Sequence, residues 1–452
     1  MPGTNLLQTL TMPCNMTLTQ SYESQRDLPM SMAYRRGTTL VAQRSYSYDS
    51  LGRPLTRSTA RNGQTVNDSF VHNSRSELAS ATVNGASYGY GYDNIGNLRM
   101  AMEASDYTLY EANALNQYTS IQENEEAAFT PTFDTDGNQT LVKTTTGIWT
   151  VAYDAENRPV SFTNAESNTV IECSYDYMGR CATKKLTING NITLHQRFIY
   201  RGYQQIACCD LTRSNHPCLW LITWDPSQPV ATRPLAIQKD GTWYTYGWDL
   251  TKNICEVYGQ HGYMRTAYTY TPYGEVTSRG DVEQPIQWSG EHNDTELGLV
   301  YYNYRYYNPV DGRWIRRDDI DVDFNDFLAF ENNPLMYWDI LGHYTDSVSL
   351  EVRKMLLQGY SPEEITKFLL AICAVKSASE ADKLIKRELQ FKGERNHTAR
   401  PDGGDNPYKH TKSDPNDPNS IIRRDPQTGK KKKQKKPKDY DQKRGKNNRN
   451  KR

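Results

Sequence analysis

Tyrosine and polar residues alternate in the stretch between residues 290 and 342. Tyr302, Tyr304 and Tyr306 are separated by Asn303 and Arg305, which is the period-two pattern of a strand with one aromatic face. Before this stretch the chain is repetitive and rich in tyrosine. After it the pattern becomes helical and then strongly basic. This change of pattern predicts two parts with different roles.

A degenerate repeat begins near residue 45. It reads aromatic, any residue, Tyr, Asp, two further residues, Gly or Asn, and then Arg or Asn. In its five copies, the part from the Tyr or Phe before the Asp to the final Arg or Asn covers residues 48–53, 92–97, 133–138, 153–158 and 175–180. Asp followed by Gly or Asn in the left-handed conformation forms a hairpin turn, so we expect the Asp to accept backbone N–H groups and the Arg to pair with it. Single hairpins bury little surface, so neighbouring hairpins must stack.

The hydrophobic period becomes that of a helix after Gly342. One predicted helix begins at the capping box Ser361–Glu364, and a second begins at Ser377. Apolar residues are scarce after Gly393, so this tail cannot bury a core of its own. The sequence predicts a small helical region over residues 343–392, followed by a polar, basic tail without regular structure over residues 393–452.

Charge is divided unequally between these parts, although the whole chain is neutral. From His343 onward there are 27 Lys and Arg against 15 Asp and Glu, a net charge of +12, which leaves −12 for the residues before it. An acidic body with a basic tail suggests different partners for the two parts, with nucleic acid as the candidate for the tail. The alternative is a solvated terminus without a partner.

The remaining composition narrows the class of protein. The eight cysteines show no paired spacing, so we interpret them as free thiols rather than as a disulfide framework or zinc ligands. The sequence has no apolar run of membrane-spanning length and no basic-then-apolar leader at its start, so we expect no membrane span and no secretory signal. Export would then need a dedicated secretion system or a larger parent chain.

Many fixed positions of a known family occur in this sequence. They are Gly298-Leu299, Tyr301-Tyr302, Arg305-Tyr306-Tyr307, Pro309, Gly312-Arg313-Trp314, Arg317-Asp318, Asn332-Asn333-Pro334, Asp339 and Gly342. With the repeats, these residues make the chain resemble the rearrangement-hot-spot (Rhs) or YD-repeat proteins over roughly residues 5–342. The resemblance implies a mainly β fold, with a hairpin ribbon coiled into a shell over residues 1–289 and a core-associated closing segment over residues 290–342. Family shells are commonly longer than this one.

The resemblance also implies a self-cleavage centre. The family's matching aspartates and arginine are credited with releasing the C-terminal part, and by position these are Asp318, Asp339 and Arg317. Two neighbouring carboxyl groups do not both ionise easily, so one can hold a proton while the other activates water. We expect cleavage close to Gly342. The alternative is a set of turns whose acids satisfy backbone donors.

Several positions depart from the family pattern around this pair. Asp319 and Ile340 replace the two prolines, Asp321 replaces a glycine, and His343 replaces the residue usual after Gly342. The additional carboxyl groups could weaken the coupling of the intended pair.

The tail carries a second set of candidates. His397 and His410 suit acid–base cleavage of RNA because histidine titrates near neutrality, and Arg400 and Lys409 suit phosphate contact. The lysine run Lys430, Lys431, Lys432 and Lys433 would bind phosphates without sequence preference. A metal site at His410, Asp414 and Asp417 matches no strong motif, so we expect neither a metal nor a cofactor. The alternative is a linker of Pro and Asp turns without an active site.

These observations predict an Rhs-type polymorphic toxin of interbacterial competition. Its shell would enclose a variable effector that attacks nucleic acid in the cytoplasm of a target cell, after secretion or surface delivery without a signal peptide. Such a toxin requires a cognate immunity protein in the producer. The competing hypothesis is a non-enzymatic adhesion or binding scaffold with an inert C-terminal remnant.

Overall fold

A computed structural model describes residues 6–226, 233–318, 325–342, 344–345, 411–414, 417–424 and 431–435. The chain divides into two compact units, Met1–Lys383 and Leu384–Arg452. The first unit contains two large antiparallel sheets in which every strand pairs with its neighbour in sequence. This meander follows from the short turns, which return each strand directly beside the preceding one.

The first sheet has eleven strands in chain order. They are β1 (Thr9–Met12), β2 (Met16–Tyr22), β3 (Pro29–Arg36), β4 (Thr39–Tyr48), β5 (Pro54–Arg61), β6 (Gln64–His72), β7 (Leu78–Val83), β8 (Ala86–Tyr92), β9 (Leu98–Glu103), β10 (Asp106–Ala112) and β11 (Tyr118–Glu123).

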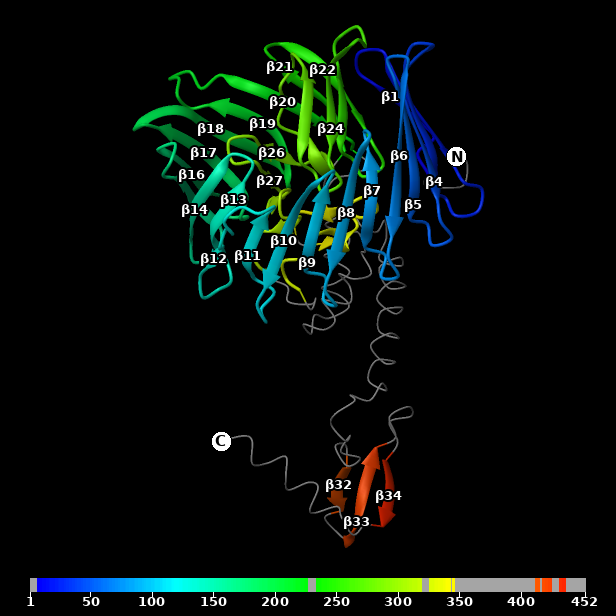
Figure 1. Ribbon diagram of the computed structural model, residues 1–452, viewed down its shortest axis with the longest axis vertical. Helices are drawn as coiled ribbons and strands as arrows, with labels where there is room; N and C mark the ends of the chain where they lie inside the picture. The colour runs from blue at the N-terminus through cyan, green and yellow to red at the C-terminus, as the bar shows by residue number, and fades with distance from the viewer. Residues whose placement is uncertain are drawn as a thin grey trace. The chain divides into compact units, whose positions relative to one another are not determined.

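The second sheet has fourteen strands, also in chain order. They are β12 (Thr132–Phe133), β13 (Gln139–Thr144), β14 (Gly147–Tyr153), β15 (Pro159–Asn164), β16 (Thr169–Tyr175), β17 (Cys181–Ile188), β18 (Asn191–Arg201), β19 (Gln204–Asp210), β20 (Cys218–Trp224), β21 (Pro234–Lys239), β22 (Thr242–Trp248), β23 (Ile254–Tyr258), β24 (Met264–Tyr270) and β25 (Val276–Gly280). In Figure 1 the blue-to-cyan first sheet and the green second sheet lie around the yellow closing segment, residues 290–342.

Five-residue loops with one shared structure join alternate strands, and we call them the capped loops. In the first, Asp49 Oδ1 accepts the N–H groups of Leu51 and Arg53 at 2.8 and 2.9 Å, and Arg53 Nε donates to Asp49 Oδ2 at 2.6 Å. Gly52 has a φ of +81°, the left-handed region that glycine adopts without steric cost. The others are Asn73–Glu77, Asp93–Asn97, Asn113–Gln117, Asp134–Asn138, Asp154–Arg158, Asp176–Arg180 and Asp249–Asn253. The predicted role of the repeat's Asp and Arg is confirmed.

The tyrosine before a capped loop fixes the open end of the preceding hairpin. Tyr48 Oη donates to the carbonyl of Pro29 at 2.6 Å, and Tyr175 Oη donates to that of Pro159 at 2.8 Å. In both hairpins the acceptor is the first residue of the partner strand. A half-buried hydroxyl needs such an acceptor, which explains why the repeat uses tyrosine rather than phenylalanine.

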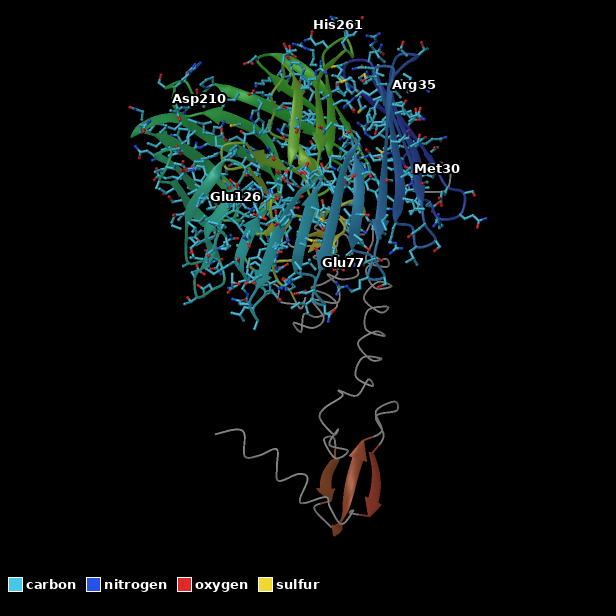
Figure 2. The ribbon with its side chains drawn as sticks, in the orientation of Figure 1. Met30, Arg35, Glu77, Glu126, Asp210 and His261 are labelled. Carbon is cyan, nitrogen blue, oxygen red and sulfur yellow. The ribbon has the colours of Figure 1, made fainter. Side chains whose placement is uncertain are left out.

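Capped loops and shorter turns alternate along the ribbon, so they gather at opposite ends of the sheets. Figure 2 shows Glu77, in a capped loop, at the end opposite Arg35 and His261. Arg35 lies beside a short turn, and His261 lies in a five-residue loop, Gly259–Tyr263, whose first residue is a glycine and therefore has no capping side chain. At the Glu77 end of the sheets, the closing segment can therefore contact the capped loops.

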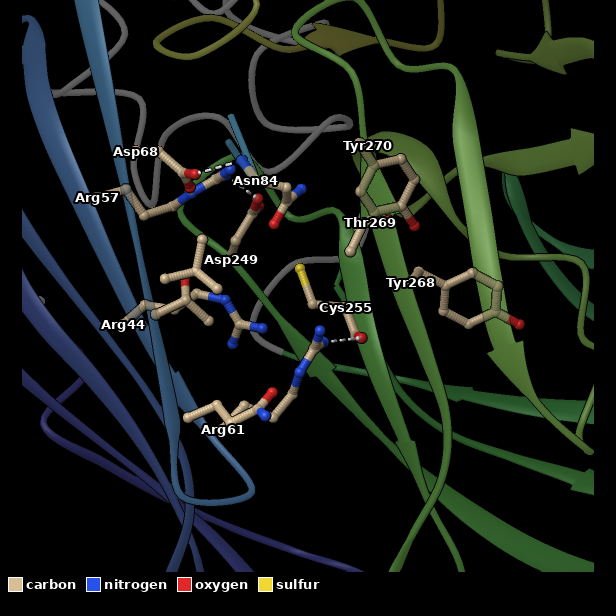
Figure 3. A pocket seen from close by; sticks show the side chains of 13 residues that line it. Arg44, Arg57, Arg61, Asp68, Asn84, Asp249, Cys255, Tyr268, Thr269 and Tyr270 are labelled. Atoms are coloured by element: carbon tan, nitrogen blue, oxygen red, sulfur yellow. Dashed lines mark hydrogen bonds and ion pairs between the residues drawn. The ribbon is translucent and has the colours of Figure 1, made fainter. Parts of the chain in front are cut away.

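The two sheets also contact each other directly. Tyr34 Oη on β3 exchanges hydrogen bonds of 2.9 Å with the backbone N–H and carbonyl of Trp248 on β22. A network of charged residues joins β5 and β6 to the loop after β22, where Arg57 lies 2.8 Å from Asp68 and 3.5 Å from Asp249 (Figure 3). Buried ion pairs of this kind fix one arrangement of the sheets because each charge needs its partner.

The closing segment forms a small sheet of its own inside the first unit. Its elements are β26 (His292–Asp294), β27 (Leu299–Tyr301), β28 (Tyr306–Asn308), β29 (Arg313–Trp314) and the 3-10 turn η2 (Phe330–Asn332). Tyr302, Tyr307, Trp314 and Phe330 are at most 2% exposed and their rings contact one another. The segment thus brings an aromatic core to the space between the sheets.

The closing segment contacts the second sheet through what we call the aromatic anchor. Tyr301 Oη accepts the N–H of Cys181 at 2.7 Å, and the ring of Tyr306 lies edge-on to Phe162 with 5.6 Å between the centroids. Lys184 on β17 lies 2.5 Å from Asp294 and 2.7 Å from Glu296.

The same segment contacts the first sheet through what we call the amide anchor. Asn332 Nδ2 donates to the carbonyl of Gly96 at 2.8 Å, and Asn333 Nδ2 donates to that of Ser76 at 2.8 Å. Asn325 Nδ2 and Arg313 Nη2 both donate to Asn97 Oδ1, at 2.9 and 3.0 Å. All three acceptor residues belong to capped loops.

The second unit contains strands where the sequence analysis expected no regular structure. They are β32 (Thr411–Asp414), β33 (Asp417–Arg424) and β34 (Lys431–Lys435), and they form a three-stranded antiparallel sheet. Polar strands of this length show little hydrophobic periodicity, which is why the prediction missed them. The predicted helices that begin at Ser361 and Ser377 lie outside the described residues. In the described part of the chain, no helix has the length and hydropathy needed to span a membrane.

Candidate functional site

Three parts of the closing segment meet around Arg305. This residue lies in the turn between β27 and β28, Asp318 follows β29, and Asp339 begins the two-residue strand β30 (Asp339–Ile340). Arg305 and Asp339 are 2% and 1% exposed, so water screens their charges weakly. Strand order inside the segment, rather than distance along the chain, brings the two predicted aspartates together.

One guanidinium group binds both carboxylates. Arg305 Nη2 lies 3.0 Å from Asp318 Oδ2 and 3.5 Å from Asp339 Oδ2. The face of the guanidinium lies 4.2 Å from the centre of the Trp314 ring, which holds its plane. A single cation between two acids allows both to approach without direct repulsion.

The same arginine holds the end of the closing segment. Arg305 Nε donates a hydrogen bond to the carbonyl oxygen of Gly342, the residue beside which cleavage is predicted. Gly342 has a φ of +78°, and a Cβ there would lie 3.0 Å from Tyr302 Cβ and 3.1 Å from the Tyr302 carbonyl. Only glycine fits this position without strain. Its carbonyl therefore contacts the same guanidinium group as the two carboxylates.

Arg317, the arginine expected from the sequence, lies elsewhere. Its Nε donates to Asp326 Oδ2 at 2.9 Å, and its side chain is 46% exposed. The contacts that the structure describes therefore join Asp318 and Asp339 to Arg305. The sequence analysis took Arg317 from its position in the family pattern. Arg305 was among the quoted family positions, which was the available clue.

A third acid lies near the pair. Glu291 is buried, and burial raises its pKa well above the usual range, with the charge of Asp339 adding to the effect and Lys252 opposing it. A buried carboxyl group that keeps its proton can act as an acid.

The remaining predicted site residues lie in or near the tail. His397, Arg400, Lys409, His410 and Lys430 lie outside the described residues, as do the departures Asp319, Asp321 and His343. Lys431, Lys432 and Lys433 begin β34. The geometry of the predicted acid–base histidines is therefore not described, and their roles stay predictions.

Comparison with known proteins decides the family. The model of the teneurin YD-shell matches residues 7–337. The chain belongs to this family. The match ends just before Asp339, so the shell and most of the closing segment are family structure.

Relatives of the YD-shell chain include one protein named as a tRNA-specific nuclease and one named as a toxin subunit. The tRNA3(Ser)-specific nuclease WapA of Bacillus spizizenii is 26% identical over 270 residues, covering 56% of this chain and 11% of that protein. Toxin subunit YenC1 of Yersinia entomophaga is 26% identical over 157 residues, covering 32% of this chain and 15% of that protein. The chain thus spans little more than a tenth of the length of these curated relatives.

The fold has solved counterparts. The crystal structure of TcdB2-TccC3-TEV superposes with a TM-score of 0.59 at 17% identity, covering 73% of this chain and 18% of that one. At this identity the likeness establishes the shared β-shell fold and nothing finer.

Proposed function

We propose that this chain is part of an Rhs-type toxin whose YD shell precedes an effector that is released by cleavage beside Gly342. The observation that carries the proposal is the meeting of Asp318, Asp339 and the Gly342 carbonyl on one guanidinium. This meeting lies where the family match ends and the basic tail begins. If the two aspartates served only to accept backbone N–H groups in turns, they would not need to share a guanidinium group with the Gly342 carbonyl.

The arrangement suits hydrolysis of a peptide bond by an aspartyl mechanism. One carboxylate takes a proton from water, and the resulting hydroxide attacks the Gly342 carbonyl carbon. Arg305 stabilises the oxyanion because its Nε already donates to that oxygen. The other carboxyl, in its protonated form, gives its proton to the departing amine as the C–N bond breaks, which frees the C-terminal part.

The released part is proposed to attack nucleic acid. Support comes from the relatives named as tRNA nucleases and from the net positive charge after residue 342. His397 and His410 would act as the acid–base pair, with Arg400 and Lys409 on the phosphate. Secretion or surface delivery, action in a target-cell cytoplasm and a cognate immunity protein belong to the same proposal.

Self-cleavage is tested on the purified chain. Wild-type protein should separate into pieces of about 340 and about 110 residues, with the new C-terminus close to Gly342 by mass spectrometry. Asp318→Asn should leave the chain whole, because an amide cannot act as the base. Asp326→Asn is the matched control, since Asp326 pairs with exposed Arg317, and it should still be cleaved. An intact wild-type chain would exclude the protease and leave the toxin open.

Toxicity is tested by expressing residues 343–452 in a bacterium. Growth arrest with degraded RNA or DNA is expected, and His397→Ala or His410→Ala should abolish it. His343→Ala changes the same residue type outside the proposed pair and should remain toxic. Normal growth with the unchanged fragment would favour a binding scaffold instead.

A further inference from the structure

Two of the seven cysteines that the structure describes lie directly opposite each other on neighbouring strands. Cys209 on β19 and Cys218 on β20 are partners in the antiparallel register of the second sheet. Opposite residues of such a pair have Cα atoms about 4.5–5.5 Å apart and side chains on one face, and disulfide bonds span Cα separations of about 4.4–6.8 Å. The strand register therefore presents two free thiols at the separation that a disulfide bond requires.

This cysteine pair is also accessible to small molecules in solution. Cys218 is exposed and Cys209 is half-buried, and most of the loop between them, residues 210–217, is exposed. Figure 2 shows Asp210, the first residue of this loop, at the outer margin of the second sheet. Burial raises the pKa of the Cys218 thiol, and the neighbouring Cys209 thiol adds to the effect, so the two sulfur atoms interact.

The other described cysteines do not combine register with access. Cys208 is fully buried and points to the opposite face of β19. Cys173 and Cys181 lie on the neighbouring strands β16 and β17, but both are buried and the register does not pair them with each other. Neither Cys14 nor Cys255 is paired with a cysteine in the described strand register. An oxidant in solution therefore reaches the β19–β20 pair most readily.

We propose that Cys209 and Cys218 form a reversible disulfide bond by exchange with a low-molecular-weight disulfide such as oxidised glutathione. The thiolate of Cys218 attacks one sulfur of the external disulfide, whose S–S bond breaks and releases one glutathione. The thiolate of Cys209 then attacks the Cys218 sulfur and releases the second glutathione. Two electrons pass from the protein to the external disulfide, and the protons of the two protein thiols pass to the two released glutathione thiols.

The bond joins the two ends of the loop over residues 210–217. Closing a loop lowers the entropy of the unfolded chain, so the oxidised protein should resist unfolding more than the reduced protein. Thiols stay reduced in the cytosol and form disulfides outside cells, and exposed disulfides are the easily reduced ones. With the delivery in the proposed function, the bond forms outside the producing cell and is reduced inside the target cell. The exchange reaction itself depends neither on that delivery nor on self-cleavage.

Mass spectrometry of the purified full chain tests the bond. The protein is equilibrated in glutathione buffers from fully reduced to fully oxidised, alkylated, and digested with trypsin, which cleaves after Arg213 between the two cysteines. Oxidised wild type should yield the peptides 202–213 and 214–239 joined by a bond that dithiothreitol removes. Cys218→Ser should abolish this linkage. Cys208→Ala, the matched control, should retain it.

Several results would overturn the inference. Alkylated Cys209 and Cys218 at the most oxidising ratio would show that the strands hold the two sulfurs apart. A linkage that survives Cys209→Ser would assign the bond to Cys208, and a linked dimer on a non-reducing gel would assign it to two copies of the chain. Cys14→Ser is a second control that should keep the linkage.

Denaturation curves measure the effect of the bond on stability. Oxidised wild type should unfold at a higher denaturant concentration than reduced wild type, and Cys218→Ser should show no such shift. Equal midpoints for the two forms of the wild type would overturn the stabilising role. Neither experiment depends on cleavage beside Gly342 or on toxicity, so the inference and the proposed function fail separately.

Discussion

The two anchors of the closing segment use different physical chemistry. The aromatic anchor places Tyr301, Tyr306 and a buried ion cluster against the second sheet. The amide anchor places asparagine side chains on carbonyl and amide oxygens of the capped loops of the first sheet, 216 to 257 residues away along the chain. The aromatic anchor removes apolar surface and charge from water, whereas the amide anchor consists of individual hydrogen bonds.

This difference suggests that one anchor mainly stabilises the closing segment and the other mainly positions it. Burial of aromatic rings is less sensitive to small shifts, so most of the aromatic anchor contributes free energy, and its single described backbone hydrogen bond, from Cys181 N–H to Tyr301 Oη, adds some alignment. Hydrogen bonds to backbone carbonyls depend steeply on distance and angle, so the amide anchor fixes which loop faces which residue. Asp318 lies in the chain between the two anchors, and Asp339 and Gly342 follow the amide anchor closely. We therefore expect the amide anchor to set the positions of these residues and the aromatic anchor to contribute more of the free energy.

The largest expected effect breaks the aromatic anchor through its ion cluster. Lys184→Met leaves Asp294 buried without a counter-ion, and removing one partner of a buried pair costs about 3–5 kcal/mol in the free energy of unfolding. Chemical denaturation measures the loss. Lys185→Met is the matched control, because its partner Glu172 is half exposed, and it should cost less than about 1 kcal/mol. Equal losses would show that the cluster is not what holds the segment.

The contributions of the two anchors to the free energy of unfolding should depend on pH in opposite ways. In the aromatic anchor, burial and Lys184 lower the pKa of His292 to about 3, below its unfolded value, so stability is lost as the pH falls from about 6.5 towards 3. Near the amide anchor, burial raises the pKa of Asp311 to about 7, so the folded state binds the extra proton and stability is lost as the pH rises from about 4 to 7.

Single substitutions isolate the two titrations. Asp311→Asn should raise the free energy of unfolding at about pH 8 and change it little at about pH 4, with each unit of pKa shift worth about 1.4 kcal/mol at most. His292→Gln should reduce the loss on acidification, whereas exposed His261→Gln should leave it unchanged. Denaturation curves at several pH values measure both. An Asp311→Asn variant with the pH dependence of the wild type would contradict the assignment.

A smaller effect is expected from the amide anchor. Asn332→Ala removes hydrogen bonds to the Gly96 carbonyl and, at 3.1 Å, to Glu77 Oε1, leaving both acceptors buried at a cost of about 1–3 kcal/mol. Its effect on self-cleavage should be larger than that loss implies, because the position of Asp318 and Gly342 depends on this anchor. Cleavage rate and unfolding free energy are measured together. Exposed Asn94→Ala, in the same capped loop as Gly96, should change neither.

Local rules in the sequence predicted much of this molecule. Asp49, Gly52 and Arg53 specify a capped loop through contacts within five residues, so the repeat and the β class could be inferred. The meeting of Asp318 and Asp339 followed from the family pattern. The role of Arg305 and the acceptors of Asn332 and Asn333 depend on strand order and sheet curvature accumulated over many hairpins, which no local pattern encodes. The strands β32–β34 lack the apolar alternation that would have indicated them.

The smallest expected effects come from two tyrosine hydroxyls. That of Tyr92 connects the hairpins to the closing segment, and that of Tyr175 acts within one hairpin. Tyr175→Phe loses a single bond to the Pro159 carbonyl, worth about 1 kcal/mol. Tyr92→Phe removes a hydroxyl that lies 2.7 Å from the Leu78 carbonyl and 2.6 Å from the Tyr273 hydroxyl, and the Tyr273 hydroxyl lies 3.3 Å from the carbonyl of Asn332. The two hydroxyl protons are shared among these three contacts. Tyr92→Phe should therefore lower the cleavage rate as well as the unfolding free energy, while Tyr175→Phe should lower the latter alone. Equal cleavage rates would show that alignment does not pass through the amide anchor.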